Sequence, residues 1–325
     1  MMTYLIRRLA YAVPILLGVN LLTFSLFFMV NTPDDMARMH LGIKHVTQPA
    51  IEAWKVQHDY AQPLFYNARE PGWRALRDTL FFNQSVRMFA LDFGESDDGR
   101  NIGEALRSRA GPSLSIALPT FVLGLWVNIG LALMLVWARA SWLDRFGIIA
   151  TVVLMSVSSL FYIIAGQYWV AHLWRLVPIS GFVPGADSWH FVLLPIVVSV
   201  MAGVGNGTRW YRSIFLEEIG KDYVRTARAK GLNESRVLFR HVLQNGLIPI
   251  LTGAVAVLPL LFMGSLLTES FFGIPGLGSY VIDAIQAQDF AVVRAMVFIG
   301  SVLYLIGLWL TDLAYTWADP RVRFS

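Results

Sequence analysis

The chain has 325 residues, of which 56% are hydrophobic and 15% are charged, and its mean hydropathy is +0.55. An ordinary soluble domain is roughly 45–50% apolar and about 25% charged, so this composition argues against a water-soluble fold. The sequence contains no cysteine, which excludes disulfides, cysteine-ligated metal sites and a thiol nucleophile. The net charge of +4 would suit nucleic acid, but basic residues in a membrane chain serve first to orient it.

Six apolar runs are long enough to cross a bilayer core about 30 Å thick, which requires about 20 residues of helix. Their one charged residue, Arg294, lies near the end of a run, where its side chain can extend toward water. Long runs without two-residue alternation predict helices and not barrel strands. We therefore predict an all-α polytopic membrane protein with six transmembrane helices. The runs are Leu9–Val30, Leu114–Trp137, Phe146–Ala171, Trp189–Thr208, Gly246–Thr268 and Ala291–Thr311.

The first run follows Arg7 and Arg8, as the apolar part of a secretory signal peptide would. It is long for such a peptide, and Phe28-Met29-Val30 offers no small-residue cleavage site. We interpret it as a retained membrane anchor.

Lysine and arginine are concentrated in those loops that a cytoplasmic N-terminus would place inside the cell. These loops contain Arg139, Arg145 and the basic stretch 209–245, whereas the short outside loops contain little more than Arg175. Because short cytoplasmic loops are enriched in basic residues, we predict that both termini are cytoplasmic.

Four parts follow from this topology: residues 1–30 with the first helix, an extracytoplasmic segment 31–112, a core of helices 2–6 over residues 113–311, and a cytoplasmic tail 312–325. The extracytoplasmic segment is rich in aromatic residues, which favours an ordered cap. Aromatic side chains lying on lipid headgroups are the alternative for part of it. Within this segment we expect Thr47 to cap a short helix that reaches His58.

The cytoplasmic loop 209–245 is the most informative polar stretch. Asp222 to Lys230 predicts a helix with an acid at its start and a base at its end, Gly231 suits a left-handed stop, and Asn233 can cap a second helix. We interpret the pair as a compact docking element. A loop that only fixes topology or binds anionic lipid is the alternative.

Two sets of side chains carry the docking interpretation. Four apolar residues of the second helix fall on one face, which can pack toward the membrane: Leu238, Phe239, Val242 and Leu243. In the first helix, Ala227 and Ala229 lie beside Tyr223 and are small enough to let a partner's groove approach closely.

The loop carries a resemblance to a known family. Tyr223-Val-Arg-Thr-Ala-Arg-Ala-Lys-Gly231, followed by His241 and Asn245, is similar to the loop signature of the permease subunits of bacterial dipeptide and oligopeptide ABC importers. Two stretches depart from the family pattern: Asn31–Asp35 replaces Gly-Asp-Pro, and Gln244 stands where the general signature has proline. Further similar segments, in family order, are Tyr4-Leu-Ile-Arg-Arg8, Leu91-Asp-Phe-Gly94, Glu269-Ser-Phe-Phe-Gly-Ile-Pro-Gly-Leu-Gly278, Gln288-Asp289-Phe290 and Asp319-Pro-Arg321.

This resemblance implies the type I ABC importer permease fold in the bacterial inner membrane and a coupling helix seated in a cleft of an ATPase subunit. It also implies a homologous second permease, two ATPases that bind ATP and Mg²⁺, a periplasmic binding protein and a peptide substrate, with a nickel chelate as an alternative. No cofactor is expected in this chain itself. The implied coupling residues are Asp222, Tyr223, Arg225, Ala227, Arg228, Ala229, Lys230, Gly231, His241 and Asn245.

The sequence lacks the residue patterns that several other functions require. The one Gly-Lys pair, Gly220-Lys221, is followed by Asp222 and does not form a phosphate-binding loop. None of the six runs contains Asp or Glu, which disfavours a proton- or sodium-coupled secondary transporter. Zinc-binding and serine-hydrolase patterns are also absent, so we expect no catalytic or metal-binding residue. A channel and a membrane scaffold are the remaining alternatives.

Candidates for a translocation path or outer gate follow the fifth run. Glu269 closes that run, where it can lie at the outer mouth, cap the interface or accept from a loop amide, and these alternatives stay open. Helix prolines such as Pro249 can free backbone carbonyls, although ordinary helix packing is the favoured explanation for any single one of them. The candidates are Glu269, Pro275, Gly276, Gly278 and Asp289.

Overall fold

A computed structural model describes residues 2–42, 46–58, 60–185 and 187–318. Within these residues the regular elements are helices, and the only β feature is an isolated bridge between Glu95 and Asn101. The predicted all-α class is confirmed. The Asp319-Pro-Arg321 motif and the end of the predicted cytoplasmic tail lie outside the described residues.

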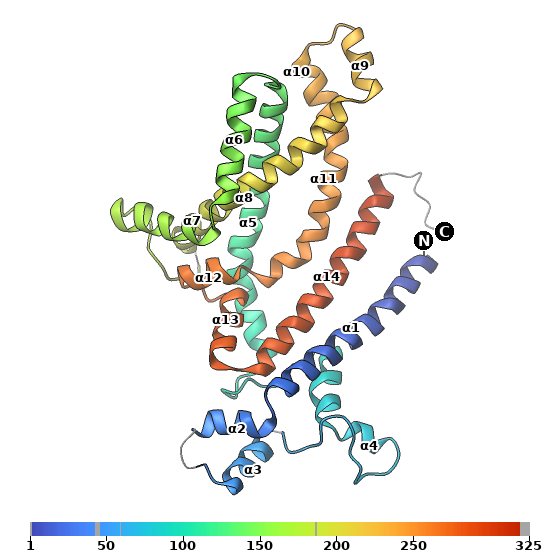
Figure 1. The fold of residues 1–325 in the computed structure, drawn as a ribbon, viewed down its shortest axis with the longest axis vertical. Coiled ribbons are helices and arrows are strands. Elements are labelled where there is room, and N and C mark those ends of the chain that lie inside the picture. The colour runs from blue at the N-terminus through green and yellow to red at the C-terminus, as the bar shows by residue number, and fades with distance from the viewer. Residues whose placement is uncertain (1, 43–45, 59, 186, 319–325) are drawn as a thin grey trace. The chain divides into compact units, whose positions relative to one another are not determined.

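Figure 1 shows the helices in chain order. Short π- and 3₁₀-helical stretches, labelled η, interrupt or extend several of them. The elements are α1 (Met2–Val30), α2 (Pro33–Leu41), α3 (Gln48–Gln57), α4 (Arg74–Arg77), η1 (Phe82–Val86), η2 (Arg87–Ala90), α5 (Ile102–Trp137), α6 (Trp142–Ser156), α7 (Ser159–Gly166), η3 (Gln167–Leu173), α8 (Ser188–Ile219), α9 (Asp222–Ala229), α10 (Glu234–Val237), η4 (Leu238–Val242), α11 (Leu243–Val257), η5 (Leu258–Met263), α12 (Leu266–Phe272), α13 (Leu277–Ala287) and α14 (Phe290–Ala318).

The chain forms two compact units, which we describe separately. The first contains the chain up to Ser108 together with Val281–Leu305, and the second contains Arg109–Tyr280 and the end of α14 from Ile306. The coupling-loop residues belong to the second unit.

Five helices among the described residues are long and apolar enough to cross a membrane: Ala10–Val30, Ile102–Trp137, Ser188–Ile219, Glu234–Met263 and Phe290–Ala314. A sixth crossing requires the pair Trp142–Ser156 and Ser159–Leu173, whose axes are bent by 88°. The prediction of six crossings therefore holds only if this pair is one broken span. The single straight helix expected over Phe146–Ala171 is wrong.

The break between α6 and α7 is stabilised by its own side chains. Val157 adopts an extended conformation, and the Ser158 hydroxyl accepts a hydrogen bond from the Leu160 N–H at 3.3 Å. The Tyr162 hydroxyl donates to the Leu154 carbonyl at 2.8 Å. Because these bonds satisfy backbone groups that the break leaves without a helical partner, an apolar stretch can turn here without proline or glycine.

The fifth predicted run is interrupted as well. The helix that begins at α10 ends at Gly264, whose φ of +69° lies in the region that favours glycine, and α12 starts afresh two residues later. A Cβ at Gly264 would overlap the Glu269 carboxylate and lie 2.8 Å from the Ser113 hydroxyl. The prediction of one helix over Gly246–Thr268 is therefore wrong at its C-terminal end.

The first unit has a core between α1 and the following polar segment. Phe24 and Phe28 of α1 are buried with Ile51 and Trp54 of α3 and with Leu80. This packing gives that part of residues 31–112 an ordered core, while other aromatic side chains, Tyr66 and Trp73 among them, are exposed.

Two caps in that unit illustrate how local signals act. The helix predicted after Thr47 is present as α3, but the Thr47 side chain makes no capping hydrogen bond, so that detail is wrong. Thr32 instead caps α2 reciprocally with Asp35: the Asp35 N–H donates to the Thr32 hydroxyl and the Thr32 N–H donates to the Asp35 carboxylate, each at 3.2 Å.

Candidate functional site

The predicted first helix of the loop is α9, and its ends match the sequence signals. Asp222 lies in its first turn and Arg228 in its last, which complements the helix dipole. Gly231 follows with φ +77° and donates its N–H to the Arg228 carbonyl at 2.9 Å. A Cβ at Gly231 would meet no atom within 4 Å, so the backbone conformation and not lack of space requires glycine here.

The second predicted helix is present but is not short. Asn233 caps α10, accepting a hydrogen bond from the Ser235 N–H at 3.3 Å, as expected. From α10 the helix continues through η4 and α11 as the span Glu234–Met263. The loop therefore contains one separate helix, α9, followed directly by a membrane-crossing helix.

A π-helical turn changes which side chains of that span are buried. Leu238 and Val242 are buried and Leu243 is partly buried, as predicted, whereas Phe239 is 61% exposed, so its placement on the apolar face is wrong. The turn η4 spans Leu238–Val242, and its longer hydrogen-bond loop rotates the side chains relative to an α-helix.

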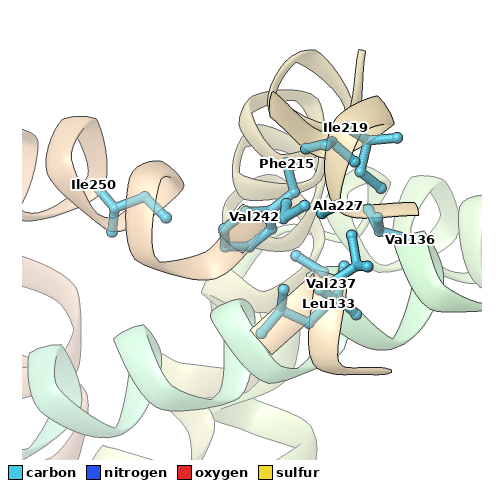
Figure 2. Packing of buried hydrophobic residues seen from close by; sticks show 11 residues of the cluster. Leu133, Val136, Phe215, Ile219, Ala227, Val237, Val242 and Ile250 are labelled. Atoms are coloured by element: carbon cyan, nitrogen blue, oxygen red, sulfur yellow. The ribbon is translucent and has the colours of Figure 1, made fainter. Parts of the chain in front are cut away.

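The inner face of α9 packs against the chain's own helices, as Figure 2 shows for Ala227. Val224 and Ala227 are buried, at 0% and 5% exposure, so Ala227 is not available to a partner. The interpretation that both alanines face a partner's groove is therefore wrong for Ala227, whereas Ala229 is exposed. The surrounding core residues are Leu133 and Val136 of α5, Phe215 and Ile219 of α8, and Val237 and Val242 of the following span.

The outer face of α9 and its C-terminal turn are open to solvent and mostly charged. Asp222 and Arg225 form an exposed ion pair at 3.5 Å, which contributes little to stability. The exposed members of the predicted coupling set in this helix and turn are Asp222, Arg225, Arg228, Ala229, Lys230 and Gly231, and Asn245 of the following span is exposed as well.

A buried carboxylate fixes the turn that enters α9. Glu218, at the end of α8, accepts hydrogen bonds from the Lys221 ammonium at 2.5 Å and from the Tyr223 hydroxyl at 2.6 Å. Burial and this bond raise the pKa of Tyr223 to about 12, so the phenol stays protonated and donates at neutral pH. The Asn245 side chain lowers the pKa of Tyr223 and so offsets part of this rise. It also donates a hydrogen bond to the His241 carbonyl at 2.8 Å. The structure thus brings Tyr223 and Asn245 together.

Another ion pair closes the turn that leaves α9. The Arg228 guanidinium donates to both oxygens of Glu234, through Nε at 3.1 Å and Nη2 at 2.5 Å. This contact lowers the pKa of Glu234 and raises that of Arg228. The pair spans the glycine turn and links the end of α9 to the start of the next membrane span.

An ion pair that the sequence reasoning missed connects α8 to α6. Arg212 Nη2 donates to both Asp144 oxygens, at 2.8 and 3.1 Å, and Asp144 is 6% exposed. Asp144 also accepts from the Ala140 N–H in the preceding loop at 3.2 Å. The sequence signalled only the start of α6: Ser141 followed three residues later by Asp144 is a helix-capping pattern, and Ser141 does cap α6, but no local pattern pairs Asp144 with Arg212.

Glu269 is almost completely buried, at 1% exposure, and it accepts from three backbone amides. Oε1 accepts from the Ser265 N–H at 3.0 Å, and Oε2 accepts from the Gly278 and Ser279 N–H groups at 2.7 and 3.1 Å. Of the alternatives left open by the sequence, the contacts match an acceptor for loop amides, two of them in the first turn of α13 and one at the start of α12.

The turn between α12 and α13 is packed tightly onto this carboxylate. A Cβ at Gly276 would overlap the Glu269 carboxylate, and one at Gly278 would lie 2.6 Å from the Ser265 carbonyl carbon. Pro275 lies in the same turn. Beside it is a cavity of about 320 Å³ that Glu269 lines together with Ser113, Thr120, Phe121, Ser199 and Ser265.

Asp289 lies in the first unit and caps α14. Its Oδ1 accepts from the Val292 N–H at 3.2 Å, and its Oδ2 accepts from the Asp97 N–H at 3.1 Å. The five predicted gate residues are thus divided between the two units. Arg294, one turn further along α14, is 4% exposed, so the expectation that its side chain extends toward water is wrong.

Comparison with known proteins places these features in context. The family model described as binding-protein-dependent transport system inner membrane component matches residues 112–324. A Brucella melitensis protein named "Putative peptide transport system permease protein" is 33% identical, and the match covers 100% of both chains. The oligopeptide transport system permease protein AppB of Bacillus subtilis and the glutathione transport system permease protein GsiC of Salmonella typhimurium are each 28% identical, again over 100% of both chains.

Proposed function

This chain belongs to the family of binding-protein-dependent transport system inner membrane components, and we propose that its α9 loop couples ATP hydrolysis in a partner subunit to the passage of peptides. The chain is a multi-pass membrane permease component and not a catalyst. The proposal concerns how its parts act and what they act with.

The packing of α9 carries the proposal. One face of this helix is fixed in a core shared with α5, α8 and the following span, while the opposite face is exposed and charged. The hydrogen bonds to Glu218 fix the turn between α8 and α9. The Arg228–Glu234 ion pair fixes the turn between α9 and the next span. A force applied to the exposed face is therefore passed to two membrane-crossing helices without first unfolding the loop.

The partners follow from this role. An ATPase subunit that holds ATP and Mg²⁺ receives the exposed face of α9, and a homologous second permease completes the pathway. A binding protein delivers the peptide on the other side of a bacterial inner membrane, with both termini of this chain in the cytoplasm. Closure of the ATPases moves α9 and swings the helices from inward-open to outward-open, which admits the peptide. The names of the relatives favour a peptide over a nickel chelate.

Gly231 provides the test. In the transporter reconstituted from this permease, its partner permease, the ATPases and the binding protein, Gly231→Val should abolish ATP-dependent uptake of short peptides. The left-handed backbone conformation is disfavoured by about 1–2 kcal/mol for a residue with a β-branched side chain, so the turn would favour a geometry other than the one observed. Gly231→Asn is the matched control, because asparagine tolerates this conformation, and it should retain most of the uptake.

Two outcomes would contradict the proposal. Unchanged uptake with Gly231→Val in a correctly inserted chain would remove the coupling role of the turn. Peptide flux through this chain reconstituted alone, without ATPases, would make it a channel or uniporter.

A further inference from the structure

The first unit contains a polar cavity that the coupling loop does not explain. Its volume is about 730 Å³, within the range of about 300–1,000 Å³ that is usual for small-ligand sites. The walls come from the extracytoplasmic segment between Gln57 and Asn101 and from the first turn of α14. The cavity is therefore built by the part of the chain that the topology places outside the membrane and by the outer end of one span.

Arg294 lies in the wall of this cavity and is 4% exposed. Its Nη2 donates to the Gln84 side-chain oxygen at 2.7 Å, and its guanidinium carbon lies 5.7 Å from the ring centres of both Phe24 and Phe28. Its Nε and Nη1 are buried and have no hydrogen-bond partner among the described residues. A buried guanidinium with unsatisfied donors is costly, so the site lacks an acceptor.

The remaining charges of the cavity are mostly acidic. Four carboxylates line it along with the second arginine, Arg87. One of them, Asp97, is held in place through its backbone N–H by the Asp289 carboxylate of α14. A buried cation and a group of carboxylates thus face the same space. The four acidic residues are Asp92, Glu95, Asp97 and Asp98.

We propose that this cavity binds a short zwitterionic peptide. The terminal carboxylate accepts hydrogen bonds from Nε and Nη1 of Arg294, and the terminal ammonium lies among the carboxylates that line the same cavity. Charge-assisted hydrogen bonds of this kind are short and about twice as strong as neutral ones. The assignment rests on the proposed peptide-transport function and adds to it a subsite in the extracytoplasmic unit.

The mixture of charges favours this ligand over an acidic side chain of a docking protein. An acidic protein surface would be attracted by Arg294 but repelled by the four carboxylates around it, whereas a zwitterion satisfies both signs at once. Tyr60, which is stacked on Trp54 at 5.6 Å, adds an apolar wall for the peptide's backbone or side chains.

Equilibrium dialysis tests the proposal on the complete membrane complex in nanodiscs, without added binding protein. The probes are tritiated Ala-Ala-Ala and its C-terminal amide. The wild type should bind the free acid about tenfold or more tightly than the amide, which corresponds to about 1.4 kcal/mol. Arg294→Gln should weaken binding of the acid to the level of the amide. Arg100→Gln, which removes an exposed arginine outside the cavity lining, should bind as the wild type does.

The overturning results are distinct. The proposal is overturned if the wild type binds the acid and the amide equally, or if Arg294→Gln keeps the preference for the acid. It is also overturned if Arg294→Gln weakens docking of the binding protein but leaves peptide binding unchanged. If Arg294→Gln fails to assemble, Arg294→Lys decides: it keeps the charge and should retain a preference for the acid. ATP-dependent uptake in the same preparation, without binding at this cavity, would refute the subsite and leave the proposed function standing.

Discussion

Replacing Glu269 removes an acceptor on which three backbone N–H groups depend, the buried ones of Gly278 and Ser279 and the partly buried one of Ser265. A buried donor that loses its acceptor costs about 1–3 kcal/mol. If all three donors bore this full cost, Glu269→Ala would lower the free energy of unfolding by about 3–9 kcal/mol. Water from the adjacent cavity of about 320 Å³ can replace part of the loss, which places the expected value near the lower end.

Glu269→Gln is the more discriminating change. Its remaining oxygen can accept from Gly278 and Ser279, while its amide group then faces the Ser265 N–H, and two donors cannot bond to each other. One lost acceptor predicts a decrease in the free energy of unfolding of about 1–3 kcal/mol. Glutamine should therefore destabilise the chain less than alanine does.

The measurement is reversible denaturation of the purified chain in mixed micelles, followed by the loss of helical circular dichroism. Glu217→Gln is the control, because Glu217 is exposed and its substitution should change the free energy by no more than about 0.5 kcal/mol. If alanine and glutamine at position 269 both stay within that margin, the carboxylate does not hold the turn and the reasoning fails.

Three further predictions use the same unfolding assay or hydrogen exchange. Asp144→Asn should lower the free energy of unfolding by about 1.5–3 kcal/mol through loss of its charged hydrogen bonds, and no change would contradict the α6–α8 link. Gly205→Ala should cost about 1–3 kcal/mol, because its Cβ would lie 2.6–2.7 Å from backbone atoms of α6; Gly203→Ala, in open space on the same helix, should be tolerated. The Glu234 pKa is lowered by Arg228, so the pair stabilises the turn above the usual glutamate pKa and this stabilisation is lost as pH falls through the lowered value. The protection factor of the α9 amides, which is corrected for the intrinsic pH dependence of exchange, should fall over that interval, and Arg228→Gln should remove this fall.

Local signals explain why α9 could be predicted and its burial could not. Asp222, Gly231 and Asn233 act within one or two turns, through the helix dipole, a left-handed stop and a cap, so their roles are visible in the sequence. Which face of α9 is covered depends on Leu133 and Val136 of α5, far away along the chain. The assignment of Ala227 to a partner failed for that reason.

Arg294 and the α6–α7 break were missed for related reasons. A lone arginine near the end of an apolar run resembles one that reaches water, and its burial comes from segments far along the chain that contribute Phe24, Phe28 and Gln84. At the break, hydropathy stays high on both sides, and only the Ser158 cap gave a local signal.

The bend between α6 and α7 makes the fit between this protein and its membrane depend on the thickness of the bilayer. The 15 residues of α6 extend about 22 Å, which is less than the hydrocarbon core of about 30 Å, whereas the 32 residues of α8 exceed it. After the turn, Phe161 and Trp169 are exposed on α7 and η3, which Figure 1 shows directed away from α6. A crossing built from this bent pair, with exposed aromatic residues after the turn, would fit a thinner bilayer than the long helix α8 does, and each ångström of mismatch costs a fraction of a kcal/mol. Acyl-chain length should therefore shift the balance between conformations of this permease.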